Sequence, residues 1–380
     1  MSNWQTKKLG DLADIIKAIG LSKKDISDDG KYEAILYGEL FRQYAEKIKV
    51  ILNRTNKTMS VSKTVYGDVL MPTSDVTPTG LATGSCVQKS GVLLGGDILI
   101  IRPKDEMLGM FFAYFIASNK KCILRITTGT TIFHLYASDL KKLEVLIPDL
   151  AEQERIVGVL EVWDNYLEKL ERKIQLKEQS KLFLSYAIFN QEISEGITQM
   201  KIKDLCMIRT GKKDVNQGNP DGVYPFFTCS REHTYSDDFS YDCEAILVAG
   251  NADVGHCKYY RGKFEAYQRT YILSDFKNID GKYLFYVMDF YFKRAIESKK
   301  QSGAMSYIKL PMLQNFLVNV PNLNIQKEIV SKFDDMNNEI ATLKSKKHQI
   351  QQQKKFLLKN LVSGTIRTPE DILEKSSVCF

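Results

Sequence analysis

Two long segments of the chain carry apolar residues at alternating spacings of four and three positions. This heptad pattern is typical of α-helices that wind around a partner helix with a left-handed twist. We expect one helix over residues 149–186 and a second over residues 322–362. Three lysines, Lys181, Lys347 and Lys354, interrupt the pattern. The residues expected to face a partner helix are Ile156, Leu160, Trp163, Leu167, Leu170 and Ile174 in the first helix, and Ile329, Phe333, Met336, Ile340, Leu343 and Ile350 in the second.

The two helices would most simply pair with each other. At ~1.5 Å per residue each is a rod of ~57 Å, and an apolar seam of that length would otherwise face water. Antiparallel pairing would place the regions that precede the two helices at opposite ends of the rod. The alternative is a coiled coil that joins two copies of the chain.

The sequence around the start of each helix occurs twice. Residues 147–156 (IPDLAEQERI) match residues 320–329 (VPNLNIQKEI), an offset of 173 positions, and the match continues along both helices. Weaker matches extend upstream, where Asp11–Leu12 corresponds to Asp204–Leu205. The chain is therefore expected to contain two similar halves, each a module followed by a helix.

The start of the first helix carries a capping signal. Asp149 follows Pro148 and is a candidate N-cap, with Glu152 three residues later as its capping-box partner. The second copy has Asn322 and Ile325 at these positions. We therefore expect the second helix to be capped less strongly than the first.

The regions ahead of the helices contain short runs of β-branched and aromatic residues, bounded by Gly, Asp and Asn. Such runs predict strands. Each region also has one apolar stretch, 110–117 or 283–296, that is expected to form a buried helix. The strands are expected at 34–37, 68–71, 97–101 and 144–147 in the first region and at 224–227, 245–248 and 270–273 in the second.

Together these patterns predict an α+β chain with an internal pseudo-two-fold repeat. Two mixed α/β modules would be separated by two long helices that pair as an antiparallel coiled coil. The expected parts are a first module (1–147), a first helix (148–190), a second module (200–320), a second helix (321–363) and a C-terminal tail (364–380).

Charge and cysteine usage narrow the class of protein. The 380 residues include 53 Lys and Arg against 46 Asp and Glu, a net charge of +7 that is compatible with a polyanionic partner. The longest apolar run is too short to cross a bilayer, and the first residues lack the apolar core of a signal peptide. Seven scattered cysteines without a C-x-x-C pair favour reduced thiols. We expect a cytoplasmic protein with no metal, no cofactor and no membrane partner.

Basic and amide side chains occur in the expected loops of both modules. Arg, Asn and Gln can bind base edges, whereas Lys and backbone amides mainly bind phosphates. Each such residue is a candidate for DNA contact, and the alternative is a solvated surface charge. The candidates are Lys23, Lys24, Tyr37, Arg54, Lys63, Thr128, Thr130, Arg209, Lys212, Lys213, Arg231, Asn251, Arg261, Gln268, Arg269 and Lys299.

The sequence holds no recognisable catalytic constellation. It lacks the G-x-x-x-x-G-K-[ST] phosphate loop, an Asn-Pro-Pro-Tyr motif for base methylation, and histidines at metal-ligand spacing. A loose nuclease pattern, P-D…E-x-K, begins at Pro148–Asp149 and ends at Glu171–Lys173. Its two ends would lie ~33 Å apart on one helix, too far to share a metal ion. We therefore expect a non-catalytic chain.

Several of these sequences together resemble the specificity subunit of type I restriction–modification systems. The resemblance is carried by the opening Trp4 with Lys8–Leu12, by Thr127–Thr131 leading to Asp139–Leu140, and by the motif at 147–156. It covers essentially the whole chain, in two copies.

The resemblance implies that each module is a target-recognition domain that reads one half of a bipartite DNA site. The paired helices would set the spacer between the half-sites and dock two DNA methyltransferase subunits. An ATP-dependent restriction and translocase subunit would join that complex. Two other functions remain open: a coiled-coil scaffold that does not bind DNA, and a self-contained DNA nuclease or methyltransferase.

Overall fold

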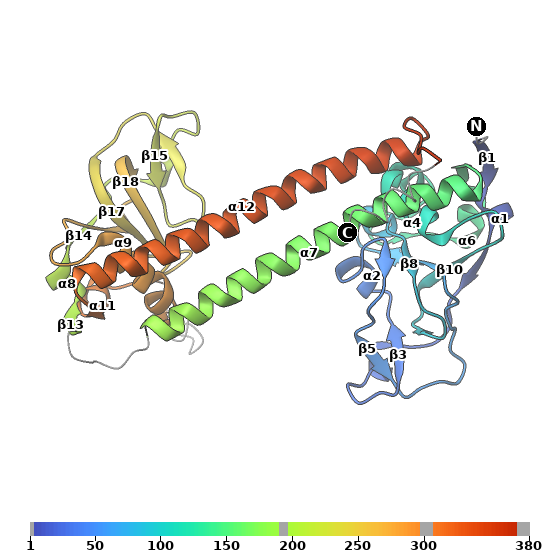
Figure 1. The fold of residues 1–380 in the computed structure, drawn as a ribbon, viewed down its shortest axis with the longest axis horizontal. Coiled ribbons are helices and arrows are strands. Elements are labelled where there is room, and N and C mark those ends of the chain that lie inside the picture. The colour runs from blue at the N-terminus through green and yellow to red at the C-terminus, as the bar shows by residue number, and fades with distance from the viewer. Residues whose placement is uncertain (1–3, 190–196, 297–306, 371–380) are drawn as a thin grey trace. The chain divides into compact units, whose positions relative to one another are not determined.

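The computed structural model describes residues 4–189, 197–296 and 307–370 (Figure 1). The chain divides into two compact units. Unit 1 contains residues 1–171 and 346–380, and unit 2 contains residues 172–345. Each unit thus combines one module with part of both long helices. Within the described ranges, none of the helices is both long and apolar enough to span a membrane.

Unit 1 is a mixed module built from short strands and short helices. Its strands are β1 (Gln5–Lys8), β2 (Ala13–Lys17), β3 (Tyr32–Ile35), β4 (Lys47–Ile48), β5 (Asn53–Thr55), β6 (Val69–Pro72), β7 (Ser74–Asp75), β8 (Ser85–Val87), β9 (Leu93–Leu94), β10 (Ile98–Pro103), β11 (Phe133–His134) and β12 (Glu144–Ile147). Its short helices are α1 (Leu9–Leu12), η1 (Lys23–Asp25), α2 (Glu39–Arg42), α3 (Pro78–Leu81), α4 (Gly109–Ser118), α5 (Lys120–Leu124) and α6 (Ala137–Leu140). A five-stranded sheet, β2-β10-β6-β8-β4, forms its centre, beside the sheet β5-β3-β9 and the pairs β1-β12 and β11-β7.

The core of unit 1 forms around α4, the apolar helix predicted at 110–117. Residues 109–116 are all buried, as expected of a helix that is apolar on every face. Phe111, Phe112 and Tyr114 share one cluster with Ile156 and Leu160 of the first long helix. The module therefore closes its core against the helix that follows it.

Unit 2 has a related arrangement. Its strands are β13 (Thr198–Lys201), β14 (Met207–Thr210), β15 (Tyr224–Phe227), β16 (Thr234–Ser236), β17 (Tyr241–Ala249), β18 (Cys257–Ala266), β19 (Thr270–Ser274) and β20 (Leu317–Val320). Its short helices are α8 (Ile202–Leu205), η2 (Val215–Gln217), α9 (Gly281–Val287), a π-helical turn (Met288–Phe292) and α11 (Leu310–Gln314). The main sheet is β14-β19-β17-β18-β15-β16, and β13 pairs with β20.

The predicted strands and helices occur close to their expected positions, with one informative difference. The strand expected at 34–37 ends at Ile35. The Leu36 N–H donates to the carboxylate of Glu39 (3.2 Å), so the chain turns there into α2. Tyr37 therefore lies in a loop, where its side chain is exposed.

The internal repeat is confirmed by the element bounds. The long helices are α7 (Leu150–Phe189) and α12 (Leu323–Val362), which coincide after a shift of 173 positions, as do β12 and β20. The order β1–α1–β2 also recurs as β13–α8–β14. The predicted α+β chain of two similar halves is therefore the observed fold.

Both long helices begin with the same N-terminal cap. The Asp149 carboxylate accepts the Glu152 N–H (2.9 Å), and the Asn322 side chain accepts the Ile325 N–H (3.1 Å). The prediction that Glu152 completes a capping box was wrong. Its buried carboxylate instead accepts hydrogen bonds from Arg367 (2.6 Å) and from the indole of Trp4 (3.2 Å). The tail after α12 brings Arg367 to this position. The Glu152 carboxylate therefore binds Arg367, which is distant in sequence, and not the Asp149 N–H as in a capping box.

A buried glutamine joins each long helix to its module. The Gln153 side-chain amide donates to the carbonyls of Glu106 and Pro148 (2.9 Å each) and accepts the Leu108 N–H (2.9 Å). Gln326 does the same in unit 2, with the Pro321 carbonyl and the Asp280 N–H (2.7 Å each). Both glutamines are fully buried. This shared role explains why the repeat is closest around these positions.

Within each unit the two long helices run side by side in opposite directions (Figure 1). In unit 1, Glu171 pairs with Lys347 and Asp164 pairs with Lys354, while in unit 2 Glu178 pairs with Lys344 (2.6 Å). Residue numbers thus fall along α12 as they rise along α7, which confirms antiparallel pairing within one chain. Eight of the twelve predicted seam residues are buried, and the partly buried exceptions are Trp163, Leu167, Met336 and Ile350.

Candidate nucleic-acid interface

Five loops of unit 2 are held together by main-chain hydrogen bonds. They comprise residues 210–213, 227–231, 249–256, 267–269 and 307–308, which we call loop cluster 2. The turn at 267–269 is bonded to three of the other four loops. The connecting bonds are Gln268 N–H to Lys213 O (3.0 Å), Gly250 N–H to Arg269 O (3.0 Å), Tyr267 N–H to Phe227 O (3.0 Å) and Ile308 N–H to Gly250 O (2.8 Å).

Unit 1 contains the same network. Loop cluster 1 comprises residues 18–24, 35–38, 73–77, 95–97 and 134–136, and the turn at 95–97 occupies the central place. Its bonds are Gly96 N–H to Leu21 O (3.1 Å), Thr73 N–H to Asp97 O (2.9 Å), Gly95 N–H to Ile35 O (2.8 Å) and Leu135 N–H to Thr73 O (2.9 Å). The two modules therefore present different side chains on the same main-chain hydrogen-bond network.

Loop cluster 2 brings together six of the predicted DNA-contact residues, Lys212, Lys213, Arg231, Asn251, Gln268 and Arg269. Lys212, Gln268 and Arg269 are exposed, and within the described part of the chain no carboxylate lies within 4.0 Å of either cation. Arg231 is also exposed and pairs with Asp253 (3.2 Å). The Asn251 amide oxygen is buried and lacks a hydrogen-bond partner among the described residues. Gln268 and Arg269 border a cavity of about 380 Å³ with Tyr271 and Tyr307.

Lys213 of loop cluster 2 helps to hold the module together, and two further candidates in unit 2 lie on strands. Lys213 is half-buried and lies 3.6 Å from the fully buried carboxylate of Glu265. Arg209 on β14 donates to the Ser274 hydroxyl (2.8 Å) and lies over the Tyr241 ring. Arg261 is exposed in the middle of β18. Lys299 lies outside the described residues.

The candidates in unit 1 are more dispersed. Lys23, Lys24 and Tyr37 are exposed in loop cluster 1. Lys63 is also exposed. It lies beside loop cluster 1, since the N–H of the neighbouring Ser62 donates to the Ile19 carbonyl (2.7 Å). Arg54 lies on β5 and donates to the Gly30 carbonyl (3.3 Å).

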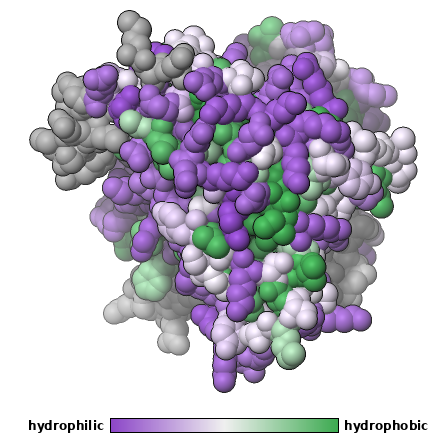
Figure 2. All heavy atoms as spheres, turned by 90° about the vertical axis from the view of Figure 1, so that its right-hand side faces the viewer, coloured by the Kyte–Doolittle hydropathy of each residue, from purple (hydrophilic) through white to green (hydrophobic). Residues whose placement is uncertain are grey.

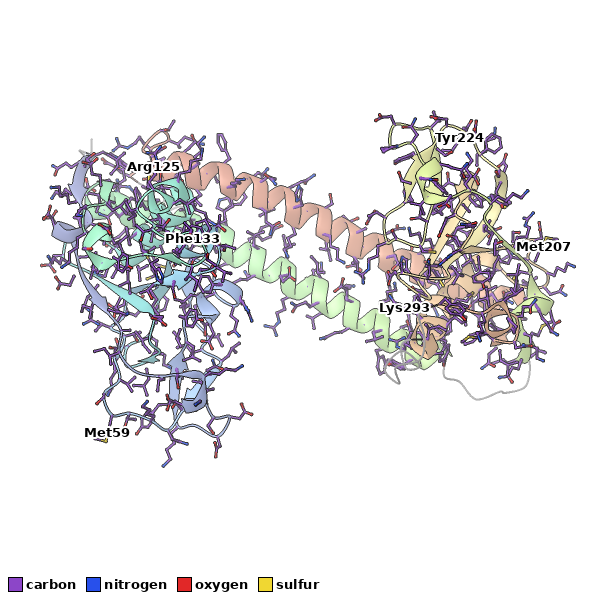
Figure 3. All side chains as sticks on the ribbon, turned by 180° about the vertical axis from the view of Figure 1, so that it is seen from behind. Met59, Arg125, Phe133, Met207, Tyr224 and Lys293 are labelled. Carbon is purple, nitrogen blue, oxygen red and sulfur yellow. The ribbon has the colours of Figure 1, made fainter. Side chains whose placement is uncertain are left out.

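The Thr128–Thr130 segment and Arg54 occupy different parts of unit 1. Thr128 bonds to His134 in both directions and closes the base of a hairpin; both Thr128 and Thr130, which lies within the hairpin, are exposed. Figure 3 shows the labelled residues Arg125 and Phe133 far from Met59, which lies at the extremity of the loop after β5. The threonine hairpin begins from loop cluster 1, whereas Arg54 lies on β5, where its carbonyl accepts the Ser27 N–H (2.9 Å).

Burial sets the protonation of several groups near the clusters. Desolvation lowers the pKa of His256, so this imidazole is neutral at pH 7 and adds no charge to loop cluster 2. Burial also lowers the pKa of Lys258, whose ammonium donates to the Ser230 carbonyl (2.9 Å). Burial raises the pKa of Glu39, beside loop cluster 1, to about 7. Among the described residues of loop cluster 2, Lys212, Arg231 and Arg269 are the exposed cations, and Arg231 is paired with Asp253.

Charge alone would not identify these clusters. Figure 2 shows a face on which hydrophilic side chains predominate, with a small apolar strip among them. Sequence reasoning also missed Asp97 and Tyr307, because it favoured basic and amide residues. The Gly95–Gly96–Asp97 turn was the available signal for Asp97. The repeated hydrogen-bond network, by contrast, identifies both clusters without reference to charge.

Comparison with known proteins agrees with this architecture. The EcoDI specificity subunit of a type I restriction enzyme from Escherichia coli is 31% identical over 153 residues, which are 40% of this chain and 34% of that protein. The chain thus spans about a third of that relative. The MjaVIII specificity subunit of Methanocaldococcus jannaschii is 21% identical over 96% of this chain and 93% of that protein.

Solved structures show the same fold. The S subunit of a type I restriction–modification system from M. genitalium superposes with a TM-score of 0.68 and 17% identity, covering 95% of this chain and 96% of that one. A chain from a study of type I complex assembly gives 0.58 and 16%, over 94% and 97%. A family model for the type I restriction modification DNA specificity domain matches residues 1–178 and again residues 194–352. The chain therefore belongs to the family of type I restriction–modification DNA specificity subunits.

Proposed function

We propose that each loop cluster binds one half of a bipartite DNA site, and that the chain selects the target for a type I methylation and restriction complex. The paired helices would fix the unread spacer and dock two DNA methyltransferase subunits. An ATP-dependent restriction and translocase subunit would complete the complex. Because the proposed target is chromosomal DNA, the proposal places the protein in the cytoplasm.

The observation that carries the proposal is the repeated loop network with unlike side chains. Two half-sites of different sequence have the same backbone geometry, so one scaffold can approach both. Discrimination between them requires different side chains at equivalent positions. Loop clusters 1 and 2 meet both requirements, since their main-chain bonds agree and their exposed residues differ.

The alternatives receive less support. In the described ranges, no three His, Cys, Asp or Glu side chains converge as metal ligands. The acidic ends of the nuclease-like pattern have structural partners, because Asp149 caps α7 and Glu171 pairs with Lys347. A scaffold without DNA binding would not require exposed cations such as Lys212 and Arg269, neither of which has a carboxylate within 4.0 Å among the described residues.

DNA binding is expected to weaken steeply as salt rises. Each phosphate contact contributes about −0.9 to the slope of log K against log salt concentration, because binding releases condensed counterions. Lys212→Ala should make the slope shallower by about 0.9 without changing the preferred sequence. The measurement is fluorescence anisotropy with a random-sequence duplex over a KCl series.

Lys277→Ala is the matched control for this experiment. Lys277 is exposed, but its main chain is bonded to Leu205 at α8, outside loop cluster 2. This variant should keep the wild-type slope. A wild-type slope near zero would contradict the proposed DNA binding.

A further inference from the structure

The central turns of the two loop clusters make equivalent main-chain hydrogen bonds and carry opposite charges, although Asp97, unlike Arg269, has a positive φ. Residues 95–97 precede β10 and residues 267–269 precede β19. Each turn bonds to three loops of its own unit, and these loops correspond between the units. Asp97 in unit 1 corresponds to Arg269 in unit 2, and Gly96 corresponds to Gln268. The side chains at these positions therefore differ, although the main-chain hydrogen bonds around them correspond.

The charge reversal excludes a shared role in phosphate binding. Both half-sites present the same negatively charged backbone, so a turn that contacted phosphates would be expected to be basic or neutral in both modules. Asp97 would repel a phosphate. Base edges, in contrast, differ between half-sites and offer both acceptors and donors. A position that alternates between Arg and Asp therefore has the chemistry of base recognition.

Hydrogen bonds to the main chain of Arg269 fix the position from which its side chain extends. Its carbonyl accepts the Gly250 N–H (3.0 Å) and the Cys229 thiol (3.4 Å). Arg269 is exposed and borders the cavity together with Gln268, Tyr271 and Tyr307. Bidentate recognition of a base requires a backbone held in place and guanidinium N–H groups that are free to donate.

Asp97 is held in an equally defined position. Its φ of 59° lies in the left-handed region, which Asp tolerates better than most residues. Its carbonyl accepts the Thr73 N–H (2.9 Å), and the Thr73 hydroxyl lies 3.4 Å from its carboxylate. The carboxylate is 55% exposed, and the only cation paired with it in the described chain is Lys17 at 3.8 Å. It remains available as an acceptor.

We propose that these turns are the base-reading elements, with Arg269 binding the O6 and N7 atoms of a guanine in one half-site and Asp97 accepting from the N4 amino group of a cytosine in the other. Gln268, beside Arg269, would bind an adjacent base. This inference rests on the proposed function and deepens it by assigning specificity to two named positions. Lys212, at the margin of its cluster, would bind phosphate.

The test is reciprocal mapping of methylated sites. Arg269→Ala and Asp97→Asn would be expressed separately, each with the methyltransferase subunits of the system, and genomic DNA would be mapped at single-base resolution. Arg269→Ala should reduce the preference for guanine at one position of one half-site by roughly five- to a hundred-fold. Asp97→Asn should relax a cytosine in the other half-site and admit adenine there, because Asn pairs well with adenine.

Two controls keep this test decisive. Lys212→Ala should lower methylation at all sites alike without altering the sequence, and thermal melting of each variant should match the wild type within a few degrees. If Arg269→Ala folds and methylates an unchanged sequence, the assignment of that turn is wrong. Exchange of a whole module separates this failure from a failure of the proposed function, since the exchange would still change one half-site.

Discussion

Replacement of Gln153 by alanine is expected to lower the free energy of unfolding of unit 1 by about 3–5 kcal/mol. The change leaves three backbone groups without partners, the buried carbonyl of Pro148 and the partly buried Glu106 carbonyl and Leu108 N–H. A buried polar group that loses its partner costs about 1–3 kcal/mol, and relaxation of the site makes the total smaller than the maximum. Few single substitutions exceed this size.

Urea denaturation followed by tryptophan fluorescence measures this effect in the right unit. The chain has two tryptophans, and Trp4 and Trp163 both belong to unit 1. Glu154→Ala changes the exposed neighbour of Gln153 and should leave the midpoint almost unchanged. An equally small shift for Gln153→Ala would show that the glutamine does not join α7 to its module.

Lys354→Met is expected to destabilise unit 1 by a similar amount, about 3–5 kcal/mol. Lys354 is 13% exposed and contacts Asp164 and, at 3.5 Å, Glu46. The Tyr114 hydroxyl donates to the same Asp164 carboxylate (2.6 Å). Removing the ammonium group leaves two partly buried carboxylates without their cation, and breaking a pair in this way costs more than the pair contributed.

A double-mutant cycle tests this explanation. Asp164→Asn combined with Lys354→Met removes both charges of the closest pair and should recover part of the stability lost in the single variant. Lys355→Ala, at the exposed neighbouring position, serves as the control. Equal losses in the single and double variants would mean that packing, not charge, accounts for the effect.

The interruption of the heptad pattern at Lys354 shows where sequence reasoning ends. The spacing of apolar residues predicted both helices and their pairing, because that pattern is local and occurs twice. The reason for a lysine in the seam is not local. It requires Glu46 from the module, far away in sequence, and Tyr114 from α4, which lies over the same site.

The candidate DNA contacts show the same limit. A basic residue type marks Lys212 and Lys213 alike, but only the fold shows that Lys213 faces the buried Glu265 while Lys212 remains exposed. Asp97 was not a candidate, because a carboxylate is an unusual choice for a DNA-binding surface. Its importance follows only from its correspondence with Arg269, which depends on hydrogen bonds between loops that are distant in sequence.

Exchange of residues 1–147 for the module of a relative tests the central claim most directly. The hydrogen bonds of loop cluster 1 lie within unit 1 and those of loop cluster 2 within unit 2, so each should bind its half-site without the other. The donor module should come from a relative with matching residues at the start of α7, since Ile156 and Leu160 complete the core. Mapping of methylated sites in cells that carry the complete system should show one half of the target replaced and the other half retained. A target changed in both halves, or in neither, would contradict modular recognition.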